Sequence, residues 1–87
     1  MRVVIVYREA SDHRLSVEQF LRDYRFRTGN DIEIVDPDGR EGASFCRLYD
    51  IVSYPTIIAL SPDGSMYHIW QGQHLPTISE VAAVANT

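Results

Sequence analysis

The chain has 87 residues, 45% of them hydrophobic and 23% charged, which is typical of one small globular domain. Its formal charge of −4 argues against nucleic acid or an anionic membrane as a partner, and no apolar run is long enough for a signal-peptide core or a membrane span. One cysteine excludes an intrachain disulfide and a four-thiolate metal site, so we expect a reduced, cytoplasmic setting.

The first part of the chain predicts a strand, a helix and a second strand. Residues 3–7 form an apolar run without polar alternation, which is typical of a central strand buried on both faces. Ser16 and Gln19 are spaced as a capping box for a helix that ends at Gly29. The apolar face of that helix holds Val17, Phe20, Leu21 and Tyr24. Residues 32–36 should then pair parallel to the first strand, because the connection crosses over through a helix.

The middle of the chain predicts a short helix and a hairpin. Residues 43–49 should form the helix, with Phe45, Leu48 and Tyr49 as its packing residues. Residues 56–60 and 66–71 read as two strands around Ser61-Pro62-Asp63-Gly64, whose proline and glycine suit a tight reversal. Alternation in the second of these strands places Met66, His68 and Trp70 on one face and Tyr67 and Ile69 on the other.

A last helix follows the hairpin. Thr77 and Glu80 are spaced as a second capping box. The inner stripe of this helix should contain Ile78, Val81, Ala82 and Ala85.

The hairpin region also resembles the second half of a thioredoxin-like domain. The residues that match the pattern of that family at the expected spacing are Tyr49, Ile51, Pro55, Thr56, Gly64 and Gly72. The resemblance implies an α/β fold in the order β-α-β-α-β-β-α, with a four-stranded mixed sheet and helices on both faces. The resemblance extends over residues 1–87 as a single domain. It also implies a cis peptide bond between Tyr54 and Pro55.

The sequence departs from this family where its Cys-x-x-Cys motif should be. Ser11-Asp12-His13-Arg14 takes that position, or Asp12-His13-Arg14-Leu15 if the alignment shifts by one residue, and neither segment contains a thiol. Ile5 also stands about where thioredoxins bury a carboxylate, so dithiol chemistry is not expected. Ser, Asp and His side chains on one turn cannot all aim at one another as a catalytic triad does. We interpret the four residues as the polar start of a helix, with anion binding assisted by Arg14 as the alternative.

The remaining thiol and imidazole groups give weak signals. Cys46 is most simply a small, buried core residue, with a reactive or partner-linked thiol as the alternative. His13, His68 and His74, with Cys46, do not show the spacing of metal ligands, so we expect neither a metal nor a cofactor.

Three functional hypotheses remain. In the family, the loop before the cis proline pairs with a bound peptide, so the resemblance implies a redox-inactive module that binds a protein or peptide at Tyr54, Pro55 and Thr56, with Tyr54 as an exposed anchor. A thiol- or glutathione-dependent enzyme is the first alternative, in which Arg8 or Arg14 meets the carboxylates of the ligand. The second alternative is a structural subunit or homodimer that uses the last strand, near Trp70.

Overall fold

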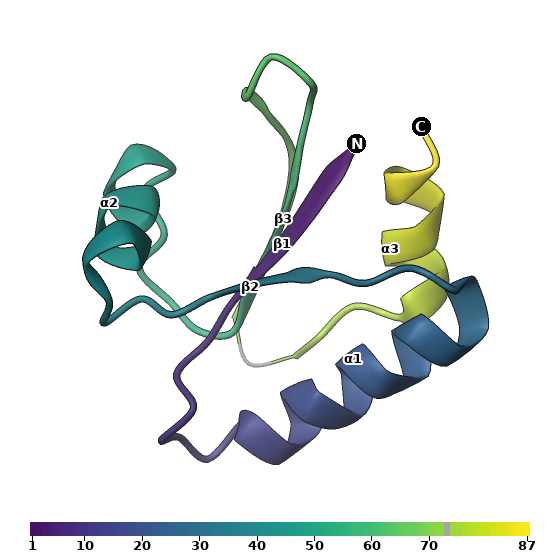
Figure 1. Cartoon of the computed structure of the whole chain (residues 1–87), viewed down its shortest axis with the longest axis horizontal. Helices are drawn as coiled ribbons and strands as arrows, with labels where there is room; N and C mark the ends of the chain where they lie inside the picture. Colours follow the sequence, from purple (N-terminus) through teal and green to yellow (C-terminus); the bar gives the residue numbers. More distant parts are fainter. Residues whose placement is uncertain (73) are drawn as a thin grey trace.

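The computed structural model describes residues 1–72 and 74–87, which form one mixed sheet flanked by helices (Figure 1). The elements, in chain order, are β1 (Arg2–Val6), α1 (Arg14–Thr28), β2 (Glu33–Val35), α2 (Arg40–Leu48), β3 (Thr56–Leu60), β4 (Met66–Gln71) and α3 (Ile78–Ala85). The strand order is β2-β1-β3-β4, with β1 and β2 parallel and the other neighbours antiparallel. This is the predicted succession of elements and the predicted sheet.

The two central strands, β1 and β3, are buried on both faces. Ile5 lies opposite Ile57 and Val4 opposite Ile58, and all four side chains are fully buried. Strands covered on both sides need apolar side chains at every position, which explains why neither segment alternates with polar residues.

The helices cover opposite faces of the sheet. In Figure 1, α1 and α3 lie on one side of the strands and α2 on the other. Val17 of α1 and Val81 of α3 pack against Ile5 and Ile57, while Cys46 of α2 belongs to the core of the opposite face. The buried members of this second core, the α2-side core, are Val4, Val6, Cys46, Ile51, Ile58 and Leu60.

Helix α1 begins differently from the prediction. It starts at Arg14, with His13 as its N-cap, and no side chain caps its first amides. The proposed capping box of Ser16 and Gln19 is therefore wrong, because Ser16 already lies inside the first turn and exposed to solvent. The C-terminal stop is correct: Gly29 has a φ of 75°, a left-handed conformation that favours glycine.

Helix α2 is longer at its start than the sequence indicated. It begins at Arg40, inside the segment that turn-forming residues suggested was a loop. Gly42 allows this, because a Cβ there would lie 1.7 Å from the backbone oxygen of Asp36. Leu48 is 73% exposed, so its predicted packing role is wrong. Phe45 and Tyr49 pack on the inner side as predicted, against the core cluster that contains Cys46.

A register shift changes the faces of β4. Ala59 lies opposite His68, but Leu60 lies opposite Met66, so β4 has one residue more than β3 between the two pairs. Leu60 belongs to the α2-side core, and its partner Met66 therefore lies on that side rather than with His68 and Trp70. The predicted alternation holds only for the second part of the strand, where Trp70 and Ile69 pack on opposite faces.

Helix α3 follows the prediction closely. Thr77 accepts a hydrogen bond from the amide of Glu80, and the Glu80 carboxylate accepts one from the Thr77 amide, so the capping box is present.

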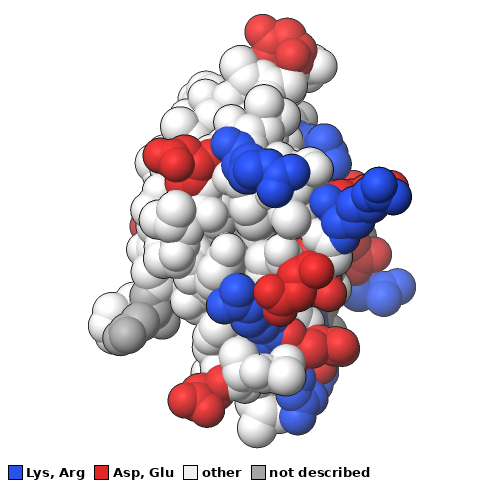
Figure 2. All heavy atoms as spheres, turned by 90° about the vertical axis from the view of Figure 1, so that its left-hand side faces the viewer, with Lys and Arg blue, Asp and Glu red and all other residues white. Residues whose placement is uncertain are grey.

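Within the described residues, no helix has the length and apolar character required to cross a bilayer. Charged side chains are distributed unevenly over the surface: in Figure 2 most of them lie over one flank of the molecule.

Candidate functional site

One side of the candidate site is the start of α1. The Ser11 hydroxyl donates to the carbonyl oxygen of Arg8, which fixes the loop after β1. The ring of His13 then lies edge-on to that of Tyr7, with centroids 6.4 Å apart. The His13 Nε2 atom is buried and has no hydrogen-bond partner, and it is the one such side-chain nitrogen or oxygen among the described residues.

The other side is the segment before β3. The peptide bond between Tyr54 and Pro55 is cis. The Thr56 hydroxyl donates to the carbonyl oxygen of Ser53 at 2.6 Å, which closes this turn from within. Because that hydroxyl is fully buried, Thr56 can take part in binding only indirectly, by holding the turn.

These two segments, far apart in the sequence, line one cavity. It has a volume of about 360 Å³, and its walls are Asp12, His13, Ser16, Tyr54 and Pro55. Four of these residues were sequence candidates from two separate motifs, and the structure brings them together. Ser16 was missed as a wall residue because its spacing to Gln19 suggested a cap. The cavity combines an aromatic ring and a proline with carboxylate, imidazole and hydroxyl groups, a composition typical of ligand sites.

Tyr54 is not the exposed anchor that the sequence suggested. It is half-buried and packs against the α2-side core. The guanidinium carbon of Arg8 lies 4.8 Å from the centre of its ring, and Arg8 Nε in turn donates to both carboxylate oxygens of Asp38, at 3.1 and 3.0 Å. This ion pair with Asp38 raises the pKa of Arg8. Arg8 therefore packs on the Tyr54 ring from the solvent side, a contact that no local sequence pattern indicates.

Cys46 lies apart from this cavity. It lines a separate space of about 350 Å³ beside α2, to which Tyr54 also contributes. Its side chain is buried, as predicted, and burial raises the pKa of the thiol, although the Tyr54 hydroxyl and the charge of Arg8 act in the opposite direction. Burial and the neighbouring Cys46 also raise the pKa of Tyr54. A thiol with a raised pKa is a poor nucleophile near neutral pH, because little thiolate is present.

The other candidates are placed outside the cavity. Arg14 pairs with Glu18 one turn along α1, at 3.1 Å, and it does not line the cavity wall. His68 stacks at a tilt on Trp70 in β4. Among the residues that the structure describes, no three His, Cys, Asp or Glu side chains lie close enough together to hold a metal ion.

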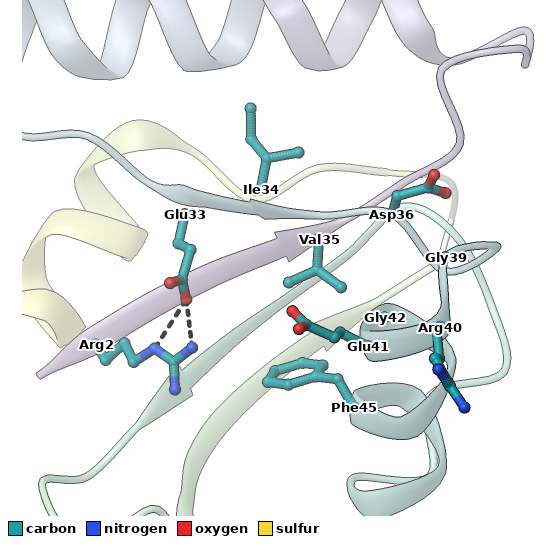
Figure 3. Close-up of a pocket in the computed structure, with 10 residues that line it drawn as sticks. All are labelled: Arg2, Glu33, Ile34, Val35, Asp36, Gly39, Arg40, Glu41, Gly42 and Phe45. Carbon is teal, nitrogen blue, oxygen red and sulfur yellow. Dashed lines mark hydrogen bonds and ion pairs between the residues drawn. The ribbon is translucent and has the colours of Figure 1, made fainter.

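A wider hollow between β2 and α2 is a weaker candidate. It has a volume of about 520 Å³ and an apolar floor made by Val35 and Phe45 (Figure 3). Its rim is charged, and the close-up shows the Glu33 carboxylate bound by Arg2. None of the residues around it, all of them in the described part of the chain, has a buried side-chain nitrogen or oxygen without a partner, so the cavity beside His13 is the stronger candidate.

Comparison with known proteins identifies the fold. No protein-family model and no curated protein matches the chain. Two solved structures match it over nearly its whole length. One is thioredoxin 1 from Thermosipho africanus, with a TM-score of 0.68 and 17% sequence identity; the match covers 99% of this chain and 91% of that one. The other is described as a malarial protein, with a TM-score of 0.67 and 18% sequence identity; the match covers 97% of this chain and 91% of that one. These likenesses, together with the sheet order and the helices on both faces, show that the chain has the thioredoxin-like fold.

Proposed function

We propose that this protein is a redox-inactive thioredoxin-like module that binds a short peptide segment of a partner protein in the cavity between His13 and Tyr54. The observation that carries the proposal is the cavity itself, which joins the start of α1 to the Tyr54–Pro55 turn. The same fold supports many functions, so the proposal rests on these side chains and not on the fold alone.

His13 supplies the polar contact of the proposed site. No group among the described residues forms a hydrogen bond with its Nε2 atom. A buried polar atom without a partner costs about 1–3 kcal/mol, and a ligand group that pairs with it recovers part of this free energy. Because no hydrogen bond holds the nitrogen, the ring can turn toward a ligand without first breaking a bond inside the protein.

Tyr54 and Pro55 supply the apolar contact. Pro55 is buried, and Arg8 and the α2-side core hold the Tyr54 ring in place, so this wall is ordered before the ligand arrives. A preorganised aromatic wall loses little conformational entropy on binding. A volume of about 360 Å³ suits one or two side chains of an extended peptide, with the rest of the peptide lying along the surface.

Thiol chemistry has less support. The chain has one cysteine, so it cannot alternate between a dithiol and an intrachain disulfide. Cys46 is buried, its pKa is raised, and it does not line the cavity. We therefore expect the purified protein to reduce insulin with dithiothreitol no faster than a control protein. Turnover like that of a thioredoxin would contradict this part of the proposal.

Binding can be tested with selected peptides. Short random peptides displayed on phage would be selected on the immobilised protein, and the selected sequences would be synthesised for affinity measurements. We expect His13→Ala and Tyr54→Leu each to weaken binding at least ~10-fold, which is ~1.4 kcal/mol. The matched control is His68→Ala, since His68 is exposed and lies on β4. Equal loss in all three variants, or in none, would overturn the proposed site.

A further inference from the structure

The charges of this chain are concentrated in its first part. Eighteen of its twenty Asp, Glu and Arg residues precede residue 51, and residues 64–79 contain none. That uncharged stretch includes the whole of β4 and the start of α3. On the face of the molecule that Figure 2 shows, most charged side chains lie on the right-hand side and uncharged residues dominate the left.

Strand β4 is an edge strand with one protection against pairing, the register shift beside Met66. It lies at the end of the sheet, it is six residues long, and its sequence Met-Tyr-His-Ile-Trp-Gln contains no charge and no proline. Met66 and Tyr67 are 51% and 50% exposed. Along an edge strand, every second residue points its backbone N–H and C=O away from the sheet, where they can pair with another strand.

The opposite edge of the sheet is protected. Strand β2 has only three residues, and Glu33 on it forms an ion pair with Arg2 at 2.6 Å. Asp36 follows the strand directly. Short length and flanking charges are the usual means by which an edge strand avoids pairing. The two edges of the same sheet therefore differ in the features that control association.

We infer that β4 is the interface of a homodimer, in which it pairs antiparallel with β4 of a second copy about a two-fold axis. A two-fold axis makes any strand complementary to itself in antiparallel orientation. Because β4 is uncharged, this pairing sets no like charges opposite each other in any register. It also keeps the charge-rich parts of two copies, each with a net charge of −4, away from the interface, which limits the repulsion between them.

The surface beside β4 fits the same partner. Trp70 of β4 and Ile78 of α3 pack against one core cluster, and Glu80 is the one charged residue of α3. A second copy would bring an equally neutral surface against this one. A strongly charged partner would find no complementary charge there.

The inference is tested by the mass of the protein in solution. We expect sedimentation equilibrium to give twice the monomer mass at high concentration, and Tyr67→Lys to raise the dimer dissociation constant at least ~10-fold. The matched control is Ile34→Lys on the β2 edge, because Ile34 is exposed to a similar extent, 55%, and lysine is introduced in both variants. It should leave the dissociation constant unchanged.

Amide hydrogen exchange provides a second readout that does not depend on a variant. If β4 pairs with a second copy, exchange of its outward amides should slow as the wild-type concentration rises, while the Ile34 amide should not respond. A monomeric mass up to roughly 0.5 mM, or an equal effect of the lysine at both edges, would overturn the inference.

Discussion

The guanidinium carbon of Arg8 lies 4.8 Å from the centre of the Tyr54 ring, so a residue of the first loop covers a wall of the cavity formed before β3. Cation–π contacts at partly exposed positions contribute about 0.5–1 kcal/mol. We therefore expect Arg8→Met and Tyr54→Leu to show a coupling free energy of that size in a double-mutant cycle measured by urea unfolding.

The control is a second double-mutant cycle, in which Arg8→Met is combined with Tyr49→Leu. The Tyr49 hydroxyl donates to the carbonyl oxygen of Gly64, away from Arg8. Its coupling to Arg8→Met should be near zero. Coupling of equal size in both cycles would mean that Arg8 stabilises the fold generally and does not act on Tyr54.

The buried thiol predicts a dependence of stability on pH. Burial raises the pKa of Cys46 in the folded state above its unfolded value of about 8.5, so the folded protein disfavours the thiolate. This contribution is fully present below the unfolded pKa and is lost as pH rises toward the folded pKa. The free energy of unfolding of the wild type should therefore fall, relative to Cys46→Ala, as the pH rises above about 8.5. If the free energies of unfolding of the wild type and Cys46→Ala instead change in parallel with pH, the thiol is accessible to water.

Gly42 should tolerate no side chain. A Cβ at this position would lie 1.7 Å from the Asp36 backbone oxygen, which belongs to a rigid turn. We expect Gly42→Ala to lower the free energy of unfolding by about 1–3 kcal/mol or more through overpacking. Gly39→Ala is the matched control, because its Cβ would meet the same oxygen at an ordinary 3.5 Å. Similar stability of the two variants would contradict the close approach of α2 to that turn.

The two proposed capping boxes should differ in stability measurements. Thr77→Ala removes a hydroxyl that accepts from the Glu80 amide, and it should cost about 1 kcal/mol. Ser16→Ala removes a solvent-exposed hydroxyl within α1 and should change stability by less than about 0.5 kcal/mol. Equal costs would mean that Ser16 caps α1 in solution.

The sequence predicts the order of elements well, because apolar runs and turn residues are local signals. It misplaces the starts of α1 and α2, since a spacing such as Ser16 to Gln19 fits a cap but does not require one. The register shift near Met66 depends on how β4 meets β3 and leaves no local pattern. The contact between Arg8 and Tyr54 joins distant segments, so only the folded chain shows that Tyr54 is held and half-buried.

Peptide binding between His13 and Tyr54 can be followed at the site itself by nitrogen-15 NMR of the imidazole rings during titration with a selected peptide. We predict that the His13 ring signals and the Tyr54 backbone amide shift together with one saturation curve, while the His68 ring stays unchanged. A peptide that binds with no change at His13, or that shifts the His13 and His68 signals equally, would show that the cavity beside Tyr54 is not the binding site.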